Sequence, residues 1–167
     1  ANPANGTLEV KNGIVPITSG DQIEEGTTLT VSATADQGYR VDSIKAGDVK
    51  VTNGGTFTVT KATVVTAFVS QIPSFVITIN QPANGTLEVK EGSNVIATGT
   101  PVLEGTVLTV SATANTGYKL DSIKVGNAKV VNGGTFTVTE AVTVTAIISQ
   151  IPKHAITFAN PANGTLE

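Results

Sequence analysis

The 167-residue sequence contains no cysteine, methionine or tryptophan, and it has a single histidine. Small secreted animal modules usually depend on disulfides, so their absence favours either an intracellular protein or a bacterial surface protein, and composition leaves both open. One histidine without cysteine cannot build a zinc site. We therefore interpret His154, which aligns with Phe75 in the preceding copy of a repeat described below, as the start of an edge strand and not as a general base.

Runs of positive charge and long apolar segments are also missing. The formal net charge is −3 with a pI near 5.1, and no cluster of Lys and Arg occurs, which argues against nucleic acid and anionic membranes as partners. No apolar stretch approaches the ~20 residues of a membrane helix, so we expect no membrane insertion. No signal peptide is recognised, and the first residue is Ala1, which suggests a processed or excised fragment.

What the sequence does contain is a repeat. The heptapeptide PANGTLE occurs at residues 3–9, 82–88 and 161–167. The two intervals are equal, because 82 − 3 = 79 and 161 − 82 = 79. Internal self-similarity at a fixed period indicates tandem duplication. A unit of 79 residues is long enough to have a core of its own, so we predict two small domains joined like beads on a string.

Alternating apolar residues predict that each unit is all-β. In VLTVSATA at 107–114, Leu108, Val110 and Ala112 share one face, as in a half-buried strand. A register shift near Asp121 is expected to turn Ile123 inward as well. The segment Asn132-Gly133-Gly134 is the strongest hairpin signal of the chain. No window has helical periodicity, so the prediction is a small β-sandwich or barrel-like unit of seven or eight strands with little or no helix.

The repeat boundaries follow from SQIP at 70–73 and 149–152, a short linker stiffened by proline. We assign residues 1–74 to a first repeat that lacks its first strand, 75–153 to a complete second repeat, and 154–167 to the first strand and turn of a third. A sheet that lacks a strand has an open edge. We therefore predict head-to-tail strand addition, in which Ala155, Ile156, Thr157 and Phe158 of one molecule dock on the first unit of the next.

The motifs ANGTLEV at 4–10, EGTTLTVSATADQGYRVDSIKAG at 25–47 and GGTFTVTEAVTVTAII at 133–148 resemble a known family. The sequence is similar to the divergent branch of the internalin-B B-repeats, also described as Listeria–Bacteroides-type repeats of bacterial surface proteins. The resemblance implies an extracellular location and a role as a stalk or spacer in adhesin-like proteins. Some relatives have a β-grasp-like fold with a short helix, but Asp42-Ser43-Ile44 stands where B-repeats commonly carry Gly-Trp.

Candidate chemical groups each have a structural interpretation. Asp42 and Asp121 recur beside the register shift and are expected to cap a turn. Glu24-Glu25 could attract calcium, but the second copy has Leu103-Glu104 there, so a repeated calcium site is not expected. The remaining candidates are the sequons at Asn5, Asn84 and Asn163, interpreted as turns, and the recurring lysines Lys45, Lys124, Lys50 and Lys129, considered for isopeptide links. We predict no catalytic, cofactor-binding or metal-binding residue, and hence no enzyme.

Two functions remain. The first is a structural stalk or spacer of a bacterial surface or secreted protein, whose partners are the adjacent repeats. The alternative is a module that binds glycans or a host protein, for which exposed aromatic side chains would be needed. The exposure of Tyr39, Phe57 and Phe68 and of their copies distinguishes the two, because a flat aromatic patch would indicate binding.

Overall fold

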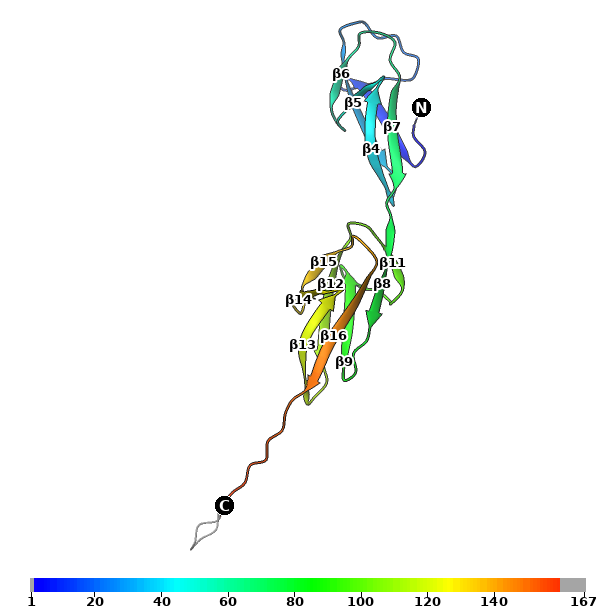
Figure 1. Cartoon of the computed structure of the whole chain (residues 1–167). Coiled ribbons are helices and arrows are strands. Elements are labelled where there is room, and N and C mark those ends of the chain that lie inside the picture. The colour runs from blue at the N-terminus through cyan, green and yellow to red at the C-terminus, as the bar shows by residue number, and fades with distance from the viewer. Residues whose placement is uncertain (1, 160–167) are drawn as a thin grey trace. The chain divides into compact units, whose positions relative to one another are not determined.

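The computed structural model describes residues 2–159, which contain β-strands and no helix (Figure 1). It divides into two compact units, the first ending at Pro73 and the second beginning at Ser74. The predicted all-β class is confirmed. No helix among the described residues is long and apolar enough to cross a membrane.

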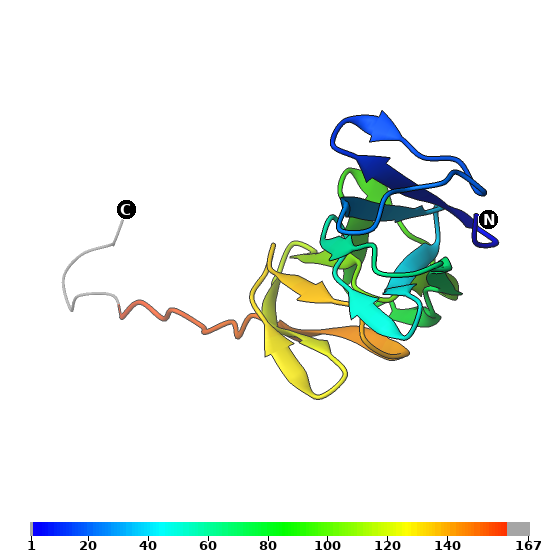
Figure 2. The same ribbon diagram turned by 90° about the horizontal axis from the view of Figure 1, so that it is seen from above.

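The first unit has seven strands in two antiparallel sheets, with the orders β2-β1-β3-β6 and β5-β4-β7. Their bounds are β1 (Gly6–Asn12), β2 (Val15–Pro16), β3 (Thr28–Ala35), β4 (Tyr39–Ala46), β5 (Val49–Val51), β6 (Thr56–Thr58) and β7 (Val65–Gln71). The short β1–β2 hairpin is drawn in blue in Figure 2.

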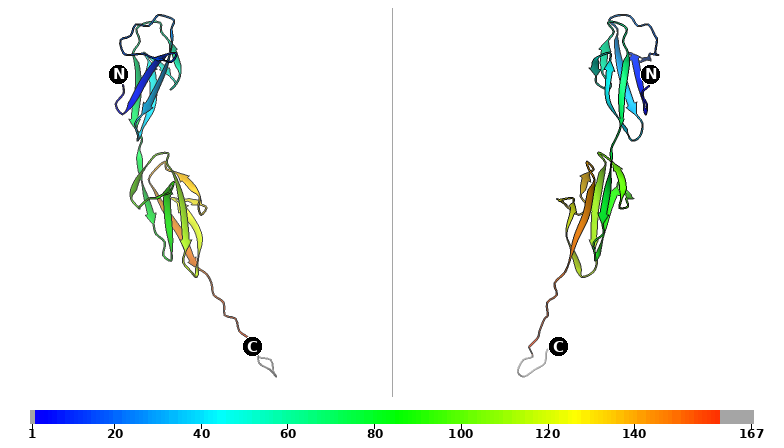
Figure 3. Two further views of the ribbon diagram at one scale, coloured as in Figure 1. Left: turned by 180° about the vertical axis from the view of Figure 1, so that it is seen from behind. Right: turned by 45° about the vertical axis from the view of Figure 1, so that its right-hand side comes forward.

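The second unit has nine strands, in the orders β10-β9-β12-β15 and β11-β8-β16-β13-β14. Their bounds are β8 (Ser74–Asn80), β9 (Gly85–Glu91), β10 (Asn94–Val95), β11 (Thr100–Leu103), β12 (Val107–Ala114), β13 (Tyr118–Val125), β14 (Ala128–Val130), β15 (Thr135–Thr137) and β16 (Val142–Gln150). Buried residues of both sheets form one hydrophobic cluster. The unit is therefore a two-layer β-sandwich, and Figure 3 shows the two layers from two sides.

The alternation predicted for residues 107–114 is confirmed in β12. Leu108, Val110 and Ala112 are buried, whereas the residues between them are only partly covered. The same pattern holds in β3, where Val31 and Ala33 are buried. Burial of one strand face follows from the two-residue period of β-structure.

The predicted register shift is also confirmed. Pairing between β13 and β16 is irregular between Leu120 and Ser122, and the same irregularity lies between Val41 and Ser43 in the first unit. An extra residue in one strand lets the side chains after it change face. Because of this bulge, Ile123 is 1% exposed and joins the core.

The predicted hairpin at Asn132-Gly133-Gly134 is wrong. The strands that flank it, β14 and β15, belong to different sheets, so the segment is a crossover between the two layers. Its backbone pairs with β12, since Gly133 N donates to the Val110 carbonyl and Val110 N donates to the Gly134 carbonyl, both at 2.9 Å. The two glycines still belong to a tight turn, because Gly133 has a φ of 79° and a Cβ at Gly134 would collide with Val130 and Val131.

The two units differ at one sheet edge. The period aligns Asn80 with Ala1, so β8 has no counterpart among residues 2–73, and residues 21–24, which align with β11, form no strand. Since β11 pairs only with β8, its absence from the first unit follows from the absence of β8. Strand β7 is also shorter than β16 and begins at Val65, whereas β16 begins at the counterpart of Thr63.

Candidate functional site

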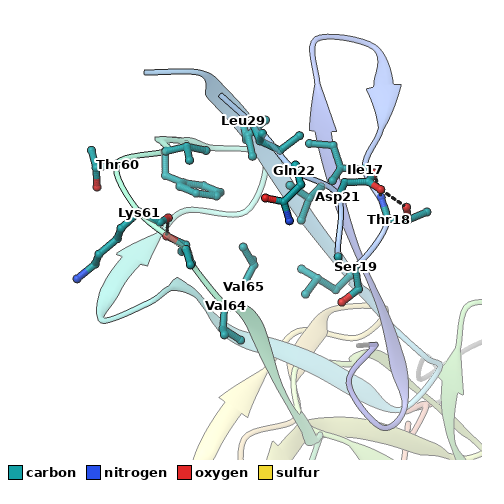
Figure 4. A pocket seen from close by; sticks show the side chains of 18 of the residues that line it. Ile17, Thr18, Ser19, Asp21, Gln22, Leu29, Thr60, Lys61, Val64 and Val65 are labelled. Atoms are coloured by element: carbon teal, nitrogen blue, oxygen red, sulfur yellow. Dashed lines mark hydrogen bonds between the residues drawn. The ribbon is translucent and has the colours of Figure 1, made fainter. Parts of the chain in front are cut away.

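A groove of about 700 Å³ opens in the first unit between the loop of residues 17–25 and the segment 59–65 (Figure 4). Its lining combines polar side chains such as Thr18 and Gln22 with apolar side chains that include Leu8, Val10, Phe57 and Val65. These four side chains also pack partly against the core of the first unit. The groove is therefore a gap in the side of the hydrophobic core.

In the second unit the same position is filled. The counterparts Leu87, Val89, Phe136 and Val144 belong to one cluster with Ile77 and Ile79 of β8 and Val102 of β11. Ile77 is fully buried there. The groove of the first unit thus has the shape left when β8 and β11 are removed from a sandwich, and its lining residues are suited to apolar side chains from an added strand.

Acidic and hydroxyl groups lie on the rim of the groove. Thr18 donates from its backbone N and from its Oγ1 to the Asp21 carboxylate, both at 2.8 Å. These hydrogen bonds, from the backbone first and the side chain second, lower the pKa of Asp21 below its ordinary value of 3.8. The side chain is exposed, so it shapes the loop without closing the groove. Asp21 could not be singled out from the sequence, because the second copy has Thr100 at this position.

The two aspartates expected to cap a turn have another role. Asp42 lies at the bulge of β4, where its carboxylate accepts a hydrogen bond from Ser70 Oγ at 2.9 Å. It also forms an ion pair with Arg40, whose Nε lies 3.4 Å away. Asp121 occupies the same place in β13 and pairs with Lys119 at 3.5 Å. Turn capping was therefore a wrong prediction. Their partners are neighbours on the sheet surface, which is the pattern of a structural residue.

The other acidic and histidine candidates are not brought together. Glu24 and Glu25 are both exposed on the 17–25 loop, and His154 is exposed after β16. Within residues 2–159 no three of His, Asp and Glu gather as a metal site would require. His154 was expected to begin a strand, but residues 154–159 form none in this single chain, since a strand requires a neighbour. The predicted turn of the third repeat lies outside the described residues.

Two of the three sequon asparagines have turn geometry. Asn5 and Asn84 have positive φ angles of 61° and 64°, which Asn tolerates better than most residues. The following Gly85 cannot carry a side chain without colliding with the Thr113 carbonyl oxygen and Ile148. The repeated Asn-Gly is thus required by backbone conformation and close packing. Asn163 lies outside the described residues.

The four recurring lysines lie on hairpins. Lys45 is in register with Lys50 across β4 and β5, and Lys124 with Lys129 across β13 and β14. All are exposed except Lys124, which is half-buried. A nucleophilic lysine is activated by desolvation in an apolar pocket, and these positions at the protein surface do not provide one. Nothing in these surroundings activates the lysines toward an isopeptide bond.

The aromatic side chains do not form a flat platform. Tyr39 and Phe57, together with their copies Tyr118 and Phe136, are half-buried, and Phe57 and Phe136 pack against the two cores. Phe68 is exposed, with Lys45 Nζ 5.5 Å from its ring centroid, but Ile147 replaces it in the second unit. The exposure test therefore separates Phe68 from the other two positions.

The sequence analysis did not predict that two asparagine side chains, Asn53 and Asn132, hydrogen-bond to the backbone of a neighbouring strand. The side chain of Asn132 accepts from Ala112 N at 2.9 Å and donates to Ala112 O at 3.0 Å, and Asn53 makes the same two bonds to Ala33. The recurrence of Asn-Gly-Gly in both copies was the available signal. It was assigned to a turn, although the amide can pair with a strand as a peptide group does.

These features define a class of protein, a tandem repeat of two-sheet β-domains. Among the described residues, no charged or polar side chain is buried in the cores. A family model described as the divergent InlB B-repeat domain matches residues 4–72 and 75–152. These matches cover most of the chain, so the chain belongs to this family, which is one of bacterial surface proteins. No curated protein and no solved structure matches it.

Proposed function

We propose that the chain is a structural spacer of a bacterial cell-surface or secreted adhesin-like protein, without catalytic activity. The main observation that supports this proposal is the path of the chain through the second unit. Strand β8, the first, and strand β16, the last, are neighbours and run parallel, with Ile77 opposite Val142 (Figure 1). Parallel terminal strands make the chain enter at one end of the sandwich and leave at the other.

The register gives the reach of one unit. Ser74 lies three residues before Ile77, and Gln150 lies eight residues after Val142, so the two ends are offset by eleven residues along the strand direction. At about 3.3 Å per residue this is about 36 Å. Each added unit of this kind would thus carry the chain forward, which is the property that a spacer needs.

The same pairing resists tension. Force applied at Ser74 and Gln150 pulls β8 and β16 in opposite directions along their length, so their hydrogen bonds are loaded together and not one after another. Strands that are pulled apart from one end of the sandwich instead separate one hydrogen bond at a time. Family membership in surface proteins supports this use.

Force spectroscopy tests the proposal. Pulling the chain from its two ends is expected to unfold the second unit in one high-force event that lengthens the chain by roughly 230 Å, the extended length of 77 residues less the folded reach. The control is the Ser93→Cys/Asn127→Cys variant tethered through these two hairpin tips, which should yield at a clearly lower force. Equal forces in both directions would contradict a role in bearing tension.

A further inference from the structure

We propose that the first unit is an acceptor and residues 153–159 are a donor, so that two copies of this chain join by strand addition. The acceptor is the groove described above together with the unpaired edge of β7. The donor is exposed, with Ile156 at 75% and Phe158 at 79%. This inference stands whether or not the protein is a spacer.

The second unit shows what fits the groove. Strand β8 occupies it there, and the donor is its copy, since Ile156 aligns with Ile77 and Phe158 with Ile79. Both β8 side chains are buried in the second core. The donor therefore offers apolar side chains at the two alternate positions that the groove requires.

The residues that follow the donor also match the start of the acceptor. Residues 159–167 read ANPANGTLE, identical to residues 1–9, where the first unit begins. Segment 153–158 is thus attached to the same nine residues that open the acceptor. No other segment of the chain has this relation to the first unit.

Shifting the observed pairing by 79 residues fixes the register. The β8–β16 pairs Ile77–Val142 and Thr78–Thr143 become Ile156–Thr63 and Thr157–Val64 in the complex. Thr63 and Val64 precede β7 in the isolated unit, although their counterparts in β16 are strand residues. We expect the added strand to extend β7 over these two residues.

A second contact distinguishes the donor from β8 itself. The β11–β8 register pairs Leu103 with Ser74, and the shift converts this pair into Glu24 opposite Lys153. Opposite charges facing each other across strands are stabilising. Residues 21–24, which form no strand without a partner, should become the counterpart of β11 when the donor binds. The charge pair occurs only between the tail and the first unit.

Sedimentation velocity on the 167-residue chain tests the association. From roughly 10 µM to 1 mM, a range suited to a small interface, we expect a concentration-dependent rise in mass. Phe158→Asp should weaken it at least about 100-fold, because the groove would have to bury a charge. Val131→Asp, at an exposed position of the second unit that does not border the groove, is the matched control and should have no effect. A monomer throughout, or association unaffected by Phe158→Asp, overturns the proposal.

Charge exchange tests the register. Glu24→Lys or Lys153→Glu alone should weaken association roughly 2- to 5-fold, and the double variant should restore it. Cross-linking provides an independent check, because the chain has no cysteine of its own. Mixed Val64→Cys and Thr157→Cys chains should form a disulfide heterodimer, whereas Val95→Cys in place of Val64→Cys should not. Equal yields from both mixtures, or no rescue by the double exchange, overturn the register.

Discussion

The two units place identical residues in different surroundings. Leu8 and Leu87 occur in the same heptapeptide, yet Leu87 is 2% exposed and Leu8 is half-buried. Val65 and Val144 differ in the same way, with Val144 fully buried. Leu8 and Leu87 have the same local sequence, so their difference comes from β8 and β11, which cover the second core and have no counterpart in the first. In this chain the core is closed in the unit that has the strand before PANGTLE and open in the unit that lacks it.

The largest expected effect comes from truncating the matched leucines. Leu87→Ala should lower the free energy of unfolding of the second unit by about 3 kcal/mol, because it leaves a closed cavity. Leu8→Ala should cost the first unit only about 1 kcal/mol, since its surroundings are already open. Equal losses would show that the groove is closed in solution.

The measurement needs a probe for each unit, and the chain supplies one. Tyr39 is the only tyrosine of the first unit and Tyr118 the only one of the second, and there is no tryptophan. In a Tyr39→Phe background, tyrosine fluorescence during urea unfolding reports on the second unit, and Tyr118→Phe reports on the first.

A smaller and equal effect is expected at the crossover asparagines. Asn132→Ala leaves the backbone N–H and C=O of Ala112 without their partner, which should cost about 2 kcal/mol. Asn53→Ala removes the same bonds to Ala33 and should cost the first unit a similar amount. The two asparagine variants sharpen the comparison of the units, because the loss in unfolding free energy should differ between the units at the groove and be the same elsewhere. A twofold or greater difference between the two losses would contradict that division.

The sequence predicted what depends on local pattern. The alternation in 107–114 identified the buried face of β12, and the clash of Leu120 and Ile123 with strict alternation identified the bulge. The crossover at Asn132 was not predictable, because Asn-Gly-Gly suits a hairpin equally well and only the partner strand decides. Strand β11 has no clear local signal, since a four-residue edge strand depends on β8 for its existence.

For the candidate site, the open edge followed from the phase of the repeat, but the groove did not. Its depth depends on the failure of residues 21–24 to form a strand, which is a consequence of three-dimensional pairing. The bond network of Thr18 and Asp21 was also hidden, because a carboxylate that accepts local hydrogen bonds has no periodic signature.

The smallest effect concerns that carboxylate. The pKa of Asp21 is lower in the folded protein than its ordinary value of 3.8, so its bonds stabilise the first unit at pH values above 3.8. This contribution is lost as the pH falls through the lowered folded-state pKa. NMR titration should show Asp21 titrating below 3.8, and Asp21→Asn should flatten the acid dependence of the first unit alone. A pKa at or above 3.8 would contradict the hydrogen-bonded loop.

Hydrogen exchange of the last strand of each unit tests most directly whether the strand before PANGTLE completes the fold. In the monomeric Phe158→Asp chain, residues 142–145 pair with β8 in a strand that also pairs with β13, whereas their counterparts 63–66 have a neighbour on one side only. We predict amide protection at least roughly tenfold lower in 63–66 than in 142–145, because an unpaired edge opens locally. Equal protection of the two segments would contradict the account.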